Sequence, residues 1–134
     1  MAASEFTFPK KEKLCSRKVI GALFSGGSSF VKYPFRVVFM KTENDEQVPV
    51  KVLITVSKKR IRRANKRNLL KRRIREAYRL NKHLLLPFLE ENSLKIAVAF
   101  VYLPDEIMTY RDIEKRMKDS LQTILKKLES NTKK

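Results

Sequence analysis

The sequence is poor in the residues that form disulfides and metal sites. It contains one cysteine, Cys15, one histidine, His83, and no tryptophan. A single cysteine excludes an internal disulfide and a zinc site of clustered thiolates, and it is typical of a free thiol in a reducing compartment. His83 has no cysteine or acidic residue near it at metal-ligand spacing, so we interpret it as a surface or packing residue.

The chain also has few glycines, and all three lie close together. Gly21 and Gly26 have the spacing of a phosphate-binding loop, but Gly27 stands where that loop needs a lysine, and no strand precedes the segment. These glycines therefore indicate the end of a helix. The acidic residues at 43–46 resemble a solvated turn, and no nucleophile has a base beside it. The absences favour a binding module over a self-sufficient enzyme.

Long hydrophobic runs are missing as well. No apolar run approaches the roughly 18 residues of a membrane-spanning helix, and the first 13 residues lack the apolar core of a signal peptide. We therefore expect a cytoplasmic protein that does not bind a membrane. The length of 134 residues and the hydrophobic fraction of 43% predict one domain over 1–134, with frayed ends at 1–8 and 130–134.

Positive charge is what the sequence has in excess. Lysine and arginine total 31 against 14 acidic residues, which gives a formal net charge of +17. The segment from Ser57 to Lys82 holds 13 of these bases and a single acid, Glu76. A solvated surface usually mixes both signs, so this segregation favours a polyanionic partner. Nucleic acid is the favoured partner, ahead of a membrane surface or an acidic protein.

Hydrophobic periodicity predicts alternating helices and strands. The order is α-β-β-α-β-α, with a possible further strand near Val31, and it indicates an α/β layer in which helices pack on a small mixed sheet. The expected elements are a helix capped by Ser16 and ended by Gly26 and Gly27, strands at 35–40 and 50–56 joined by a polar turn at 42–49, a helix from about 62 to the residues before Pro87, a strand within 94–103, and a last helix beginning at Thr109.

The basic helix is predicted to be amphipathic. At 100° per residue its apolar side carries Leu70, Ile74 and Ala77, which we expect to pack on the sheet. Arginines suit phosphate because their planar fork donates two hydrogen bonds. The opposite stripe, expected to face outward, consists of Asn68, Lys71, Arg72, Arg75, Arg79 and Lys82.

One motif in this helix is specific. The segment Arg67–Glu76 reads Arg-Asn, two residues, Lys-Arg, two residues, Arg-Glu. It resembles the signature helix of the bacterial ribonuclease P protein family. The flanking residues also fit that family, and the resemblance covers nearly the whole chain. These flanking matches are Lys11–Leu14, Phe24, Gly27, Val56–Lys59 and Thr109–Tyr110.

The resemblance implies a fold and a function. The fold would be an α/β sandwich with a four-stranded sheet and a left-handed βαβ crossover. The protein would bind a large catalytic RNA, and the complex would remove the 5′ leader from precursor tRNA. Catalysis would belong to the RNA and its Mg²⁺ ions, so the protein alone would be inactive and would hold no catalytic or metal-ligating residue. The partners would be the catalytic RNA and precursor tRNA, and not DNA.

Two sets of site residues follow. The basic segment and its motif predict contacts with the catalytic RNA, whereas a separate cleft between the first helix and the sheet would hold the single-stranded leader, since aromatic rings stack on any base. Phe24 matches an aromatic position of that cleft, and Phe39 is added from its strand position alone. The predicted RNA contacts are Lys58, Lys59, Arg67, Asn68, Lys71, Arg72, Arg75 and Arg79.

Two other functions remain open at this stage. A ribosomal-type protein that only stabilises RNA would have the same charge and element order. A protein-only metal-dependent nuclease would need clustered carboxylates or histidines, for which the sequence offers no convincing candidate.

Overall fold

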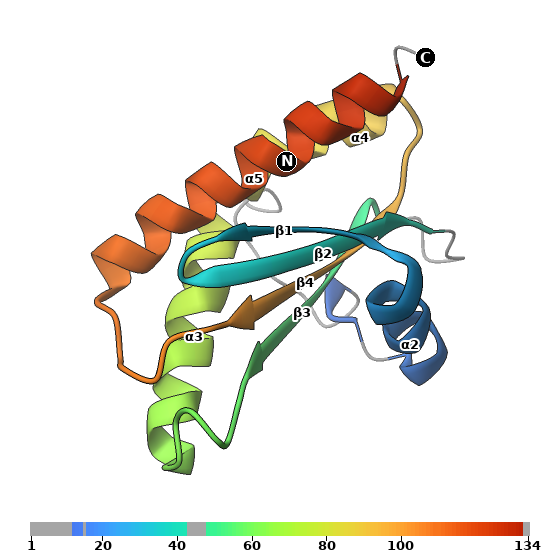
Figure 1. The fold of residues 1–134 in the computed structure, drawn as a ribbon. Coiled ribbons are helices and arrows are strands. Elements are labelled where there is room, and N and C mark those ends of the chain that lie inside the picture. The colour runs from blue at the N-terminus through green and yellow to red at the C-terminus, as the bar shows by residue number, and fades with distance from the viewer. Residues whose placement is uncertain (1–11, 15, 43–47, 133–134) are drawn as a thin grey trace.

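The protein, described here by a computed structural model, is built around one mixed sheet (Figure 1). The structure describes residues 12–14, 16–42 and 48–132. Within them the strand order is β1-β2-β4-β3, with β4 antiparallel to β2 and parallel to β3. The strands are β1 (Ser28–Lys32), β2 (Phe35–Lys41), β3 (Val50–Val56) and β4 (Ile96–Tyr102).

Helices cover the two faces of this sheet unequally (Figure 1). Helices α3, α4 and α5 pack on one face, where β2 and β3 direct alternate apolar side chains into the larger core. Helix α2 packs on the other face, over Val38, Ala97 and Ala99. The helices are α2 (Arg17–Gly26), α3 (Ala64–Asn81), α4 (Leu86–Glu91) and α5 (Tyr110–Thr132).

The predicted α/β architecture is confirmed, and so are two of its helix starts. The Ser16 hydroxyl accepts a hydrogen bond from the Val19 amide at 3.3 Å, and the Thr109 hydroxyl accepts one from the Asp112 amide at 3.3 Å. The possible strand near Val31 is present as β1. The parallel strands β3 and β4 are joined by a crossover connection that includes α3. The left-handed sense of this crossover stays a prediction.

One predicted boundary is wrong. The basic helix does not continue to the residues before Pro87 but ends at Asn81, and a 3₁₀ turn, η2 (Lys82–Leu84), follows. Pro87 lies in the first turn of α4, where its missing amide costs no hydrogen bond. The break lets Leu85 and Leu89 enter the core. At the C-terminus, α5 extends to Thr132, whereas residues 1–8, Cys15 and 133–134 lie outside the described residues, so the frayed ends stay a prediction.

Gly27 shows why the first helix stops where it does. Its amide donates to the Leu23 carbonyl at 2.9 Å. A Cβ atom at this position would lie 2.5 Å from the same oxygen and 3.1 Å from the Phe39 carbonyl. Only glycine fits this close approach without a shift of the backbone, and the chain can then enter β1 directly.

Among the described helices, none has both the length and the apolar character that crossing a bilayer requires.

Candidate RNA-binding surface

Helix α3 presents a buried apolar face and a basic outer face, as its sequence predicts. Leu70, Ile74 and Ala77 have no exposed surface and pack in the core against the sheet and α5. Arg72 and Asn68 are exposed on the opposite side. Burying one face therefore fixes the direction in which the cations point.

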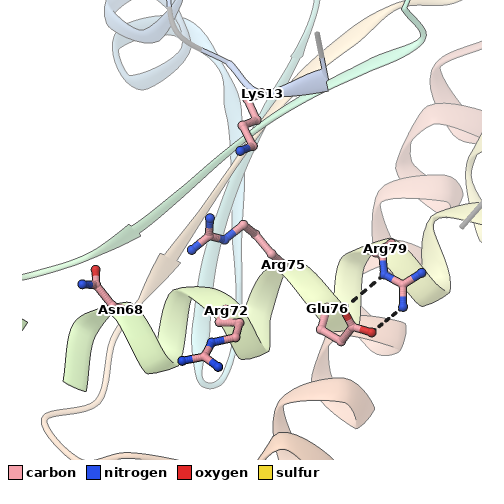
Figure 2. Close-up of a pocket in the computed structure, with 6 residues that line it drawn as sticks. All are labelled: Lys13, Asn68, Arg72, Arg75, Glu76 and Arg79. Carbon is pink, nitrogen blue, oxygen red and sulfur yellow. Dashed lines mark hydrogen bonds and ion pairs between the residues drawn. The ribbon is translucent and has the colours of Figure 1, made fainter. Parts of the chain in front are cut away.

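A groove runs along this basic face (Figure 2). It lies between α3, strand β3 and the segment 12–14, and it continues over Val52, Leu53 and Ile54 of β3. Its walls bring together five of the eight predicted RNA contacts, which are Asn68, Lys71, Arg72, Arg75 and Arg79. Arg75 is oriented by a hydrogen bond from its Nε to the Lys71 carbonyl at 3.2 Å.

The other three predicted contacts lie at the N-terminal end of α3, outside the lining of the groove. Lys58 and Lys59 are exposed in the turn after β3, where the Ser57 hydroxyl accepts a hydrogen bond from the Lys59 amide at 3.1 Å. Arg67 has a structural role as well, because its Nη1 donates to the carbonyls of Ile61 at 2.9 Å and Arg62 at 2.8 Å. This arginine therefore holds the turn that leads into the helix.

Glu76 is the one acidic residue of the groove lining, and Arg79 is bound to it (Figure 2). The Arg79 Nε donates to Glu76 Oε2 at 3.1 Å, and a second nitrogen of the same guanidinium contacts Oε1. The hydrogen bond from Arg79 lowers the pKa of Glu76 below its usual value. The charge of Arg79 is thus partly neutralised by a carboxylate. Arg72 and Arg75 are therefore the stronger candidates for binding phosphate.

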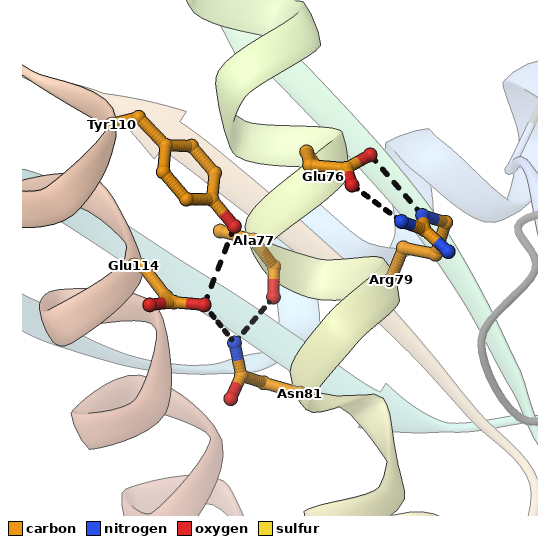
Figure 3. Close-up of polar contacts among 6 residues, drawn as sticks. All are labelled: Glu76, Ala77, Arg79, Asn81, Tyr110 and Glu114. Carbon is orange, nitrogen blue, oxygen red and sulfur yellow. Dashed lines mark hydrogen bonds and ion pairs between the residues drawn. The ribbon is translucent and has the colours of Figure 1, made fainter.

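A polar network on the other side of α3 fixes it against α5 (Figure 3). The Tyr110 hydroxyl donates to Glu114 Oε2 at 3.3 Å, and the Asn81 side-chain amide donates to the same oxygen at 3.5 Å and to the Ala77 carbonyl at 2.8 Å. Burial, together with Glu114, raises the pKa of Tyr110 to about 12. The hydroxyl is protonated at neutral pH, as an ordinary tyrosine hydroxyl is, and its hydrogen bond to Glu114 helps to hold α5 in place beside α3.

Lys82 departs from the prediction. It was expected on the outward stripe, yet it is 1% exposed, and its Nζ forms an ion pair with Glu12 Oε1 at 2.8 Å. The reason is the end of α3 at Asn81, since the 3₁₀ turn that follows rotates Lys82 away from the stripe. Lys82 therefore does not belong to the exposed cationic face.

A second open surface lies on the face of the sheet that carries α2. Pairing across the strands places Val31, Arg36, Val101 and Thr55 in one row. Val31 is 63% exposed and Arg36 is exposed, whereas Val38 and Ala99 in the neighbouring row under α2 are buried. Phe24 is 40% exposed on α2, on the same side of the sheet. A strand face with apolar and cationic side chains is thus left open beside α2.

Phe39 does not contribute to this open face, which corrects the prediction. Its side chain is 3% exposed and belongs to the core under α3 and α5, where it packs edge-on against Phe30 at 6.2 Å between ring centres. Side chains alternate along a strand, so Phe39 shares the inward face with Phe35 and Val37. The assignment to a cleft between α2 and the sheet is therefore wrong.

Comparison with known proteins identifies the family. The family model described as Ribonuclease P matches residues 8–129. The chain belongs to the ribonuclease P protein family. The ribonuclease P protein component of Porphyromonas gingivalis is 43% identical over 116 residues, which cover 87% of this chain and 85% of that protein. The protein of the same name from Chlorobaculum tepidum is 35% identical over 101 residues, which cover 70% of this chain and 66% of that protein.

Solved structures of ribonuclease P proteins share the fold. The Thermotoga maritima protein superposes with a TM-score of 0.66 at 23% identity, over 84% of this chain and 96% of that one. A Staphylococcus aureus ribonuclease P protein superposes with a TM-score of 0.60 at 24% identity, over 86% and 93%. At this identity the likeness shows the fold alone, and it confirms the architecture that the resemblance implied; the family itself is shown by the family model and the Porphyromonas gingivalis relative.

The sequence reasoning missed three elements of the surfaces in this ribonuclease P family chain. Arg36 and Val31 were not singled out, although the alternation that sends Phe35 inward also sends Arg36 to the opposite face. Lys13 was noted only as part of the family resemblance, and its place on the groove wall depends on a contact with β3. The Glu12–Lys82 pair spans 70 residues, and no local pattern signals it.

Proposed function

We propose that this chain is the protein component of a ribonuclease P holoenzyme. It binds the catalytic RNA and the 5′ leader of precursor tRNA, and it assists removal of the leader to give the mature 5′ end. The observation that carries the proposal is the cationic face of α3, with Asn68, Arg72 and Arg75 side by side in a groove, in a chain of the ribonuclease P family. The protein acts in the cytoplasm, where precursor tRNA is processed.

The α3 face would act on the RNA through its phosphates. Several like charges on one stripe repel each other in water, and bound phosphates relieve that repulsion. Arginine forks bind phosphate oxygens with two parallel hydrogen bonds, whereas the Asn68 amide is neutral and both donates and accepts. Asn68 can therefore read a base edge or a ribose hydroxyl between the phosphates that Arg72 and Arg75 hold.

The leader would lie on the open strand face beside α2. Phe24 supplies an exposed ring for stacking, and Arg36 supplies a cation for the backbone of a single strand. The exposed Val31 side chain offers apolar contact to an unpaired base. These contacts do not depend on the base sequence, which suits a protein that must accept the leaders of many tRNAs.

The RNA would carry out the catalysis. The side chains of residues 12–14, 16–42 and 48–132 include no group of three or more histidine, cysteine or acidic residues that could hold a metal ion. We propose, as the family resemblance implies, that the Mg²⁺ ions belong to the RNA, and we derive no step through a metal on the protein.

The test is cleavage of precursor tRNA by a bacterial ribonuclease P RNA at low Mg²⁺, with and without the protein. We expect strong acceleration and release of the leader at the mature 5′ end, because the protein neutralises phosphates that Mg²⁺ would otherwise have to screen. The protein without RNA should not cleave. Tight RNA binding without acceleration, for an RNA that is active alone at high Mg²⁺, would favour a purely structural RNA-binding role. Robust cleavage by RNA-free protein would overturn the proposal.

A further inference from the structure

We infer that the groove of α3 has a second cationic wall at Lys13, and that the buried Glu12–Lys82 ion pair positions this wall so that an RNA phosphate is held from two sides. The inference rests on the proposed function, because it concerns how the same groove binds RNA. It adds Lys13 as a contact, and it gives Glu12 and Lys82 the role of positioning residues.

The second wall is an extension of the sheet. Lys13 forms a parallel bridge with Val52 of the edge strand β3, and the Leu14 amide donates to the Val52 carbonyl at 2.9 Å. Leu14 is 5% exposed and packs with Leu23 beneath α2. The segment 12–14 is therefore held by both main-chain pairing and a buried side chain, at a fixed distance from α3.

Lys13 and the α3 cations face the same space. Lys13, Asn68 and Arg75 line both parts of the groove, which has a volume of about 450 Å³ in the part that includes Arg72 and Arg79. Figure 2 shows the Lys13 side chain directed from the strand side toward α3, with Arg75 on the facing wall. A phosphate that enters the groove can accept hydrogen bonds from both walls. A stripe on a single helix would contact only one side of it.

The ion pair ties this wall to the end of α3. The Lys82 and Glu12 side chains are 2% and 15% exposed, and the two residues are 70 positions apart in the sequence. The Lys82 ammonium is too deeply buried to contact RNA itself. Desolvating two charges is costly, so the pair need not stabilise the fold, and the role that we infer for it is to specify one arrangement of the chain. Here that arrangement brings Lys13, the residue next to Glu12, to the groove.

The test measures the affinity for a bacterial ribonuclease P RNA in variants of the full chain. We expect Lys13→Ala to weaken binding about tenfold and to lower the slope of log affinity against log salt by about one, as for one lost phosphate contact. Glu12→Gln should weaken binding as well. This direction is decisive, because removing a carboxylate makes the chain more positive, and attraction by net charge alone predicts tighter binding.

The Lys82→Met variant separates an effect on RNA binding from a failure to fold. Methionine fills the space of the lysine stem, and the Glu12 carboxylate left behind is partly exposed to water. The double variant with Glu12→Gln removes both charges of the pair. Both should weaken RNA binding while far-UV circular dichroism remains native. Adding Lys13→Ala to the double variant should then have much less effect than in the parent chain, because the wall is already displaced.

Matched control variants separate the effect of a residue's position in the groove from the effect of the change in net charge. Glu91→Gln on α4 adds the same charge as Glu12→Gln, and Lys126→Ala on α5 removes the same charge as Lys13→Ala, in both cases at exposed residues away from the groove. Both should change the affinity less than twofold. Unchanged or tighter RNA binding by folded Glu12→Gln and Lys82→Met variants would overturn the inference, as would Lys13→Ala with no effect. In this experiment the proposed function itself would also fail if Arg72→Ala and Arg75→Ala left RNA binding intact.

Discussion

Replacing Arg72 and Arg75 together by alanine is expected to weaken binding of ribonuclease P RNA about 100-fold while the fold remains intact. Each arginine should lose a charge-assisted contact with phosphate, and at the lower end of their range such contacts contribute about 1.5 kcal/mol each, or roughly tenfold. Arg72 is exposed, and Arg75 makes one hydrogen bond within its own helix, so stability should change by only about 0.5 kcal/mol. RNA titration and thermal unfolding measure the two effects separately.

The control for this variant is a matched pair on α5. Lys115 and Lys118 are exposed, and replacing both by alanine removes the same two charges. We expect a loss of affinity below about threefold for that pair, since distant charges contribute only through the screened field. Equal losses from the two double variants would show that net charge, and not the α3 groove, determines RNA binding. Unfolding of the Arg72 and Arg75 variant would show that the assignment of faces on α3 is wrong.

Salt concentration should have the largest effect on the affinity for RNA. If the basic surface neutralises about five to eight phosphates, the affinity for ribonuclease P RNA falls by about 10² to 10⁴ between 50 and 200 mM monovalent salt, because condensed counterions are released on binding. Titrations at constant low Mg²⁺ measure this dependence directly. The Arg72 and Arg75 double variant should show a slope smaller by about two.

The slope of log affinity against log salt also distinguishes binding through phosphates from binding through neutral contacts. A flat response to salt would contradict the cationic groove, since it would mean that stacking and neutral hydrogen bonds carry the affinity. A steep response that the double variant leaves unchanged would place the phosphate contacts on another part of the surface, such as the outer face of α5.

The sequence predicted those parts of the fold that depend on local patterns. The apolar side of α3 was predicted from its 3.6-residue period, and Leu70, Ile74 and Ala77 are buried as that period requires. The strand alternation of β2 likewise holds, with Phe35 and Val37 buried. Capping at Ser16 follows from its own side chain. In each case residues that are close together in the sequence determine which side chains are buried or where the helix begins.

Features that depend on distant contacts could not be predicted in this way. The end of α3 at Asn81 is stabilised by hydrogen bonds to Ala77 and to Glu114 of α5. Lys82 turns inward where α3 ends, and it pairs there with Glu12, which is far away in the sequence. Phe39 was assigned to a cleft although its own alternation with Phe35 places it inside, which was an error of interpretation, since the pattern already contained the answer.

The most direct test of the central claim, that RNA binds along α3, is site-directed hydroxyl-radical cleavage. In a Cys15→Ser background, which has no other cysteine, an iron chelate is attached either at Asn65→Cys on α3 or at Gln122→Cys on α5. Both positions are exposed, and neither is a proposed contact. We predict discrete cuts in ribonuclease P RNA from position 65 and few from position 122. Strong cuts from position 122, with none from position 65, would contradict the account.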